Sequence, residues 1–324
     1  MRKFGILLFC TLALMFCFPG VAYAQEGETL PDPGITPDSL FYFADKWGEQ
    51  ISLMFTFKAE NKVPKALRYA DERLAEIDAM IAKNKIKAAT RATNGYQTCL
   101  ETATQNMEQA RLKGGDVSEA VVLMSEKHLG FLGNSAGDIP EDARAVLTQT
   151  RERAMISQET ALKSMAKGNP EKAAQFNLKL MERQLNRIRV QAEEPETEGL
   201  QERLQEYNRL GNLGEEISQI AKGLGEETTV DQLVGQATAH HLEVLAETRQ
   251  RVQGQAQQEV DDAIQKRIQN HETVVTRLQA QKQLGEVPEE TPIPEEIPEN
   301  VKQEMSAGRS GQKPSLKTEE RFIP

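Results

Sequence analysis

The chain has 324 residues, of which 27% are charged and only 5% are aromatic, and its formal net charge is −10. Nucleic acids and anionic membrane surfaces attract basic proteins, so this acidic balance argues against both as partners. The length is sufficient to bury one large apolar core or two smaller ones.

Residues 1–24 have the three parts of a secretory signal peptide. Arg2 and Lys3 give a basic start, residues 4–18 are almost wholly apolar, and the segment ends in the small-x-small exit Ala-Tyr-Ala. An apolar run of about 15 residues is too short to span a bilayer, which argues against a membrane anchor. We therefore predict cleavage after Ala24 and an extracytoplasmic protein that is secreted or associated with the cell envelope.

Cleavage would leave Cys99 as the single cysteine of the exported chain, which excludes an intrachain disulfide. It would also remove two of the 39 basic residues, so that 37 face 49 acidic ones and the net charge becomes −12. We therefore expect the fold to be held by the burial of apolar side chains.

Half of the 12 aromatic residues outside the signal peptide fall within residues 41–57. We predict a linker and an amphipathic helix over residues 25–62, with the helix near 39–57 and Ser39 as its N-cap. On a helical wheel, one face is apolar and the opposite face is polar. The apolar face holds Leu40, Phe43, Ala44, Trp47, Ile51, Met54 and Phe55, and the polar face holds Asp45, Glu49, Ser52 and Thr56.

This helix has three possible environments. We expect its rings to bury against the protein's own first bundle, which would supplement a core with few aromatic residues elsewhere. The second possibility is a partner-binding surface made of Phe41, Phe43, Trp47 and Phe55. The third is membrane contact, which we do not expect, because membrane-surface helices usually carry several basic residues on the polar face.

Nearly all of the remaining chain up to residue 283 is predicted to be helical, in two units at 63–169 and 170–283. Each unit is predicted to hold four helices. Those of the first lie at about 64–83, 85–113, 117–133 and 140–167, and those of the second at about 171–191, 199–222, 229–251 and 255–283. A period near 110 residues is longer than that of common short solenoid repeats, which favours two helical bundles.

An internal duplication is indicated because the chain matches itself at a nearly constant offset. An offset of 111 pairs Tyr96 with Tyr207, and an offset of 113 pairs His128 with His241. We expect the two units to share their helix order. We also expect each tyrosine hydroxyl to be partnered or to reach solvent, and each histidine to lie near the same end of its helix.

Residues 284–324 form an acidic, proline-rich tail that contains the segment EVPEETPIPEEIPE. Sequence of this kind buries too little apolar surface to order itself, so we predict disorder. A spacer or a ligand for a partner is the alternative.

No motif predicts catalysis, a cofactor or a metal site, and we expect a protein that is not an enzyme. Cys99 is predicted to be a buried structural thiol, with a reactive thiol as the alternative. His128 and His241 are predicted to pack at helix ends, with metal ligation as the alternative, because no spacing supplies further ligands.

The stretch PGITPDSLFYFADKWGEQISLMFTF, followed by ALRYADERLAEI, resembles the domain of unknown function numbered 5667. The segment HLEVL at 241–245 is similar to the same pattern, although Leu40 stands where members of that family often have proline. The resemblance implies an exported protein of bacteria or archaea with a helical fold. It implies no activity, cofactor or catalytic residue.

These observations favour an exported, non-catalytic, all-helical interaction or structural module of the cell envelope or exterior. Its partner would be a protein or a cell-envelope polymer. The alternative is an extracytoplasmic chaperone or stress-response binder that holds clients in apolar grooves between helices. A third hypothesis, a cryptic enzyme or metal protein, would require His128, His241 or Cys99 to converge with carboxylates in one pocket.

Overall fold

The structure is a computed structural model that describes residues 30–134, 140–193 and 199–283. Within these ranges the chain forms nine helices and no strand. The predicted signal peptide and the predicted proline-rich tail lie outside the described residues. The helices are α2 (Tyr42–Met54), α3 (Ala59–Ala82), α4 (Ile86–Leu112), α5 (Ser118–Asn134), α6 (Glu141–Ala166), α7 (Pro170–Gln191), α8 (Leu200–Leu224), α9 (Glu227–Arg251) and α10 (Gln255–Gln283).

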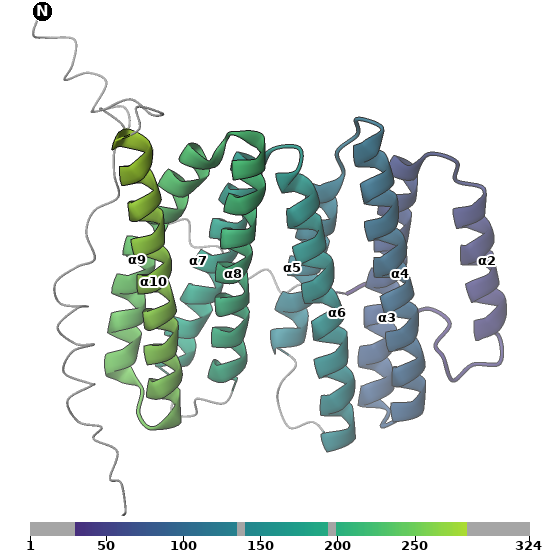
Figure 1. The fold of residues 1–324 in the computed structure, drawn as a ribbon. Coiled ribbons are helices and arrows are strands. Elements are labelled where there is room, and N and C mark those ends of the chain that lie inside the picture. Colours follow the sequence, from purple (N-terminus) through teal and green to yellow (C-terminus); the bar gives the residue numbers. More distant parts are fainter. Residues whose placement is uncertain (1–29, 135–139, 194–198, 284–324) are drawn as a thin grey trace, which may run out of the picture.

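The helices stand side by side in a row, with α2 at one end and α9 and α10 at the other (Figure 1). Consecutive helices form antiparallel pairs, α3 with α4, α5 with α6, α7 with α8 and α9 with α10. Short connections also join one pair to the next. Between α6 and α7, the Asn169 side chain accepts a hydrogen bond from the Lys172 N–H at 2.8 Å, and Pro170 occupies the first helical turn.

Two helices begin elsewhere than predicted. The aromatic helix starts at Tyr42, and Ser39 accepts a hydrogen bond from the Phe41 N–H at 3.2 Å, so it does not cap the helix itself. Helix α3 starts at Ala59, five residues earlier than expected, with Pro64 inside it. Burial of Ala59 and Val63 holds this extra turn.

The second unit repeats the neighbour relations of the first. Helix α3 contacts α5 and α4 contacts α6, and in the same way α7 contacts α9 and α8 contacts α10. These are the relations that an offset of 111 to 113 residues predicts. The predicted fold class, an all-α tandem duplicated bundle preceded by an aromatic amphipathic helix, is confirmed.

One apolar cluster spans both units. This cluster of buried side chains has members on every helix from α3 to α10, including Leu162 on α6, Leu185 on α7 and Tyr207 on α8. A second cluster, around Leu74 and Tyr96, fills the part of the first unit nearest to α2. The units therefore form one continuous stack.

The matched tyrosine and histidine residues meet in both units, but only the first unit joins them by a hydrogen bond. The Tyr96 hydroxyl lies 2.8 Å from His128 Nδ1, and Asp71 Oδ1 lies 3.3 Å from His128 Nε2. In the second unit the rings of Tyr207 and His241 are in contact, with centroids 5.8 Å apart. The Tyr207 hydroxyl and both ring nitrogens of His241 are buried without a hydrogen-bond partner.

Two expectations are therefore wrong. The Tyr207 hydroxyl is neither partnered nor solvent-exposed, and both histidines lie in the interior of α5 and α9, away from the helix ends. The second unit also differs from the first in that Arg267 on α10 lies over the Tyr207 ring. Its guanidinium carbon lies 5.7 Å from the centroid of the Tyr207 ring, and Gly211 makes room for it, since a Cβ there would clash with the guanidinium.

The core histidine of the second unit makes stability depend on pH. Burial lowers the pKa of His241 to about 3 from an ordinary value of 6.5, and the nearby His240 and Arg267 act in the same direction. Between these values the unfolded chain binds a proton that the folded chain does not. Stability should therefore fall as the pH falls through this window.

We expect His241→Leu to remove about 2 kcal/mol of the loss in unfolding free energy between pH 7 and pH 5. Urea unfolding at the two pH values measures this difference. His240→Gln is the matched control: its side chain is 66% exposed on the same helix, and because burial is the largest cause of the lowered His241 pKa, this variant should keep nearly all of the wild-type difference. Equal pH dependence in wild type and His241→Leu would contradict the assignment.

Candidate functional site

Four of the aromatic residues in and next to α2 point away from the rest of the protein, whereas Tyr42 points inward. Phe41 and Phe43 are each 72% exposed, Trp47 is 59% exposed and Phe55 is 65% exposed. No residue of this helix is fully buried. The prediction that these rings bury against the first bundle is therefore wrong, and they form an open apolar surface. We call it the α2 outward face, made of Leu40, Phe41, Phe43, Ala44, Trp47, Gly48, Ile51, Met54 and Phe55.

The polar face of α2 is the one that meets the bundle. The half-buried positions are spaced three and four residues apart, which is the pattern of one helix face. They are Tyr42, Asp45, Lys46, Glu49, Ser52 and Leu53. The two faces were predicted correctly from the helical wheel, but their orientation is reversed.

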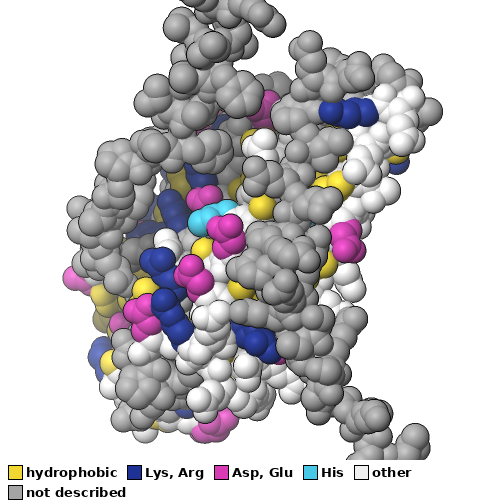
Figure 2. Space-filling view, turned by 90° about the vertical axis from the view of Figure 1, so that its left-hand side faces the viewer, with side chains coloured by type: hydrophobic (Ala, Val, Ile, Leu, Met, Phe, Trp, Pro, Cys, Tyr) yellow, Lys and Arg dark blue, Asp and Glu magenta, His cyan; other side chains and the backbone are white. Residues whose placement is uncertain are grey.

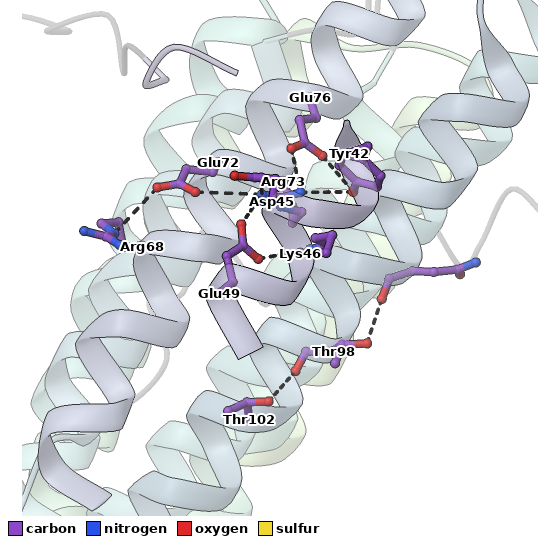
Figure 3. Close-up of polar contacts among 11 residues, drawn as sticks. Tyr42, Asp45, Lys46, Glu49, Arg68, Glu72, Arg73, Glu76, Thr98 and Thr102 are labelled. Atoms are coloured by element: carbon purple, nitrogen blue, oxygen red, sulfur yellow. Dashed lines mark hydrogen bonds and ion pairs between the residues drawn. The ribbon is translucent and has the colours of Figure 1, made fainter. Parts of the chain in front are cut away.

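A buried ionic cluster holds this orientation (Figure 3). Arg73 on α3 lies at its centre, with Nη2 2.5 Å from Glu49 and Nη1 2.6 Å from Glu76. The same Nη1 donates to the Tyr42 hydroxyl at 3.0 Å, and that hydroxyl donates to Glu76 Oε2 at 3.1 Å. We call Tyr42, Glu49, Arg73 and Glu76 the Arg73 cluster.

The Arg73 cluster is shielded from water. The side chains of Arg73 and Glu76 are 1% and 0% exposed. Burial raises the pKa of the Glu76 carboxyl to about 7, although the neighbouring Arg73 guanidinium acts in the opposite direction. Gly95 on α4 leaves the space: a Cβ there would lie 3.2 Å from both Arg73 Cδ and Lys46 Nζ. Removing one charge of such a buried cluster is strongly destabilising, because the remaining charges stay buried without a partner. The cluster therefore keeps α2 attached to α3.

Two further polar contacts fix the ends of α2. Before the helix, Asp38 pairs with Lys85 at 2.5 Å. Near its C-terminal end, Lys65 Nζ donates to Ser52 Oγ at 3.0 Å and to Thr56 Oγ1 at 2.8 Å. The helix is thus held along its whole length by its polar side chains.

A sequence signal for this arrangement existed and was missed. Arg73 lies three residues after Ala70 and four before Ile77, on the buried side of α3. A charged residue on an otherwise apolar helix face calls for an oppositely charged partner. Glu49 and Glu76 are those partners, and Glu49 belongs to the segment 25–62 that directly precedes the first unit.

The other residues considered for chemistry lie apart in the core. Cys99 is buried as predicted, and burial raises the pKa of its thiol to about 11, which disfavours the reactive thiolate. His128 and His241 each pack against the tyrosine of their own unit. In the ranges that the structure describes, no three His, Cys, Asp or Glu side chains are grouped as a metal site requires.

A shallow cavity of about 290 Å³ lies where the two units meet, between α6 and α8. Arg151 and Arg209 line it, and both are already paired with carboxylates. Arg151 Nε lies 2.6 Å from Glu206, and Arg209 Nη1 lies 2.7 Å from Glu152. These pairs cross the boundary between the units, so the cavity is part of the joint that holds them together.

The opposite end of the row differs from the α2 outward face. At the far end of the row, where α9 and α10 lie, acidic and basic side chains are interspersed with small apolar patches (Figure 2). None of the helices in the described ranges is long and apolar enough to cross a bilayer.

The fold and this site define an all-helical, tandemly duplicated protein with an exposed aromatic helix. Residues 34–153 match the family model described as "Domain of unknown function (DUF5667)", which confirms the resemblance predicted from the sequence. The match spans α2 to α5 and the first half of α6. The segment 241–245, which is similar to the same pattern, lies outside it.

No curated protein sequence matches the chain. Among solved structures, a "Circular tandem repeat protein with novel repeat topology and enhanced subunit contact surfaces" is similar over 74% of this chain, with 12% sequence identity and a TM-score of 0.45. The chain spans about half, 51%, of the length of that protein.

We expect Arg73→Met to release α2 from the bundle, because Glu49 and Glu76 would lose their shared cation. The free energy that keeps α2 docked on the bundle should fall by about 3–5 kcal/mol. Trp47 is the single tryptophan of the chain, so a fall in its fluorescence anisotropy measures the release directly.

Arg68→Met is the matched control on the same helix. Its side chain is 65% exposed and pairs with Glu72 at the surface, so the anisotropy of Trp47 should stay at the wild-type value. An unchanged anisotropy in Arg73→Met would show that the Arg73 cluster does not hold α2.

Proposed function

We propose that this protein is an exported, non-catalytic, all-helical interaction or structural module that contacts a protein or a cell-envelope polymer through the α2 outward face. The observation that carries the proposal is the exposure of Phe41, Phe43, Trp47 and Phe55 on a helix that the bundle holds in place by its opposite face. Rings left in water on a fixed support form a preorganised contact surface.

The size of the surface supports this role. Aromatic side chains bury about 150–250 Å² each, so the four rings alone expose roughly 500 Å². This is already close to the largest apolar patch of a typical monomeric protein, and such patches are often functional. The extracytoplasmic location rests on the signal-peptide pattern of residues 1–24.

The alternative, a chaperone that holds clients in apolar grooves between helices, has less support. The exposed apolar side chains of the α2 outward face lie on one helix and not in a groove between helices, and the paired charges of Arg151 and Arg209 occupy the cavity between α6 and α8 beside Leu132, Leu147 and Met155. A chaperone would suppress the aggregation of a model client, which light scattering measures.

We expect Phe43→Glu with Phe55→Glu to weaken binding to the solubilised envelope of the host at least about tenfold, since each ring contributes about 1.5–3 kcal/mol when buried. Protein and polymer fractions are titrated separately, and Trp47 emission reports binding. The matched control is Leu112→Glu with Val190→Glu, two exposed apolar residues outside α2, which should bind like wild type. Equal weakening by both double variants would contradict the proposal.

A further inference from the structure

The α2 outward face carries no charge, although the chain as a whole is acidic. None of the exposed residues from Leu40 to Phe57 is charged, because Asp45, Lys46 and Glu49 turn towards α3. Two identical copies of this face can therefore meet without repulsion between like charges. A membrane surface fits less well, since the face offers no exposed Lys or Arg to lipid headgroups.

The exposed apolar area of the α2 outward face is large enough for an interface between two copies of the chain. The four rings expose roughly 500 Å². Leu40, Ile51 and Met54, which are 96%, 43% and 66% exposed, add several hundred more. A standard interface buries about 800 Å² on each partner. The α2 outward face therefore reaches that size with apolar side chains.

The face is complementary to itself when turned end for end. Ala44, Trp47, Gly48 and Ile51 form its central stripe, at the i, i+3, i+4, i+7 spacing of one helix face. In an antiparallel pair centred between residues 47 and 48, Trp47 lies opposite Gly48. Ile51 then lies opposite Ala44, so each large side chain meets a small one. The space over Gly48 is open, since a Cβ there would meet no atom within 4 Å.

At the ends of the stripe the same register places apolar residues together. Phe41 lies opposite Met54, and Leu40 lies opposite Phe55. A two-fold interface uses the same patch on both subunits, so a patch that matches its own reverse is suited to it.

We propose that the partner of the α2 outward face is a second copy of this chain, with the two α2 helices antiparallel and Trp47 of each copy seated over Gly48 of the other. This inference rests on the proposed function, which makes the α2 outward face a contact surface, and it names the protein that occupies the surface.

The test is sedimentation over a concentration series of the full chain as its host processes it, with the emission of Trp47 followed in the same samples. Wild type should form a dimer, with Trp47 emission shifting to the blue as the dimer forms. Gly48→Leu should weaken the dimer at least tenfold, although it adds apolar surface and improves helix propensity. Ile51→Glu should do the same by placing a charge in the interface.

Gly223→Leu is the matched control, because Gly223 is also helical and also has open space over its Cβ position. It should dimerise like wild type. A wild-type chain that stays monomeric, or a dimer that both α2 variants leave intact, would overturn the inference.

The outcomes also separate this inference from the proposed function. A monomer whose Trp47 emission shifts only with an envelope fraction, and loses that shift in Ile51→Glu, would overturn the second copy as partner and keep the contact surface. A shift with neutral phospholipid vesicles alone would replace the second copy by a membrane surface. Variants that change neither association nor binding would overturn both proposals.

Discussion

The buried pairing of Arg73 with Glu49 and Glu76 decides how α2 meets the rest of the protein. Hydrophobic burial alone would turn the aromatic face of an amphipathic helix inward. Here Arg73 of the bundle is a buried cation that pairs with Glu49 of α2, and of the α2 side chains Leu53 packs against the apolar cluster around Leu74 and Tyr96. The charged face therefore turns inward, and the rings remain outside.

The duplicated units show how one core position can be satisfied in two ways. In the first, Asp71, His128 and Tyr96 form a hydrogen-bonded chain on the seam between α3, α4 and α5. In the second, Arg267 enters over the ring of Tyr207, and Gly211 on α8 makes the space for it. The helices have the same order and the same neighbours in both units. The shared apolar positions therefore determine the fold, and the buried polar residues can differ between the units without changing it.

The stack gives the outward face of α2 a rigid support. Ionic pairs between α6 and α8 join the units, and one apolar cluster runs through all eight helices behind α2. Because the row has α2 at one end and the charged surface of α9 and α10 at the other, its two ends present different chemistry (Figures 1 and 2). A partner bound to α2 would therefore leave the surface of α9 and α10 accessible.

The sequence alone determined the all-α class, most helix bounds, the duplication and the two faces of α2. The helices and the faces of α2 follow from apolar residues every three or four positions, and the duplication follows from matches such as the tyrosines 111 residues apart. Only the tertiary structure decided which face of α2 points inward, because a helical wheel separates faces without showing what lies opposite them. It also placed Arg267 beside Tyr207. Both depend on side chains far apart in sequence, whose mutual distances are set only when the helices pack.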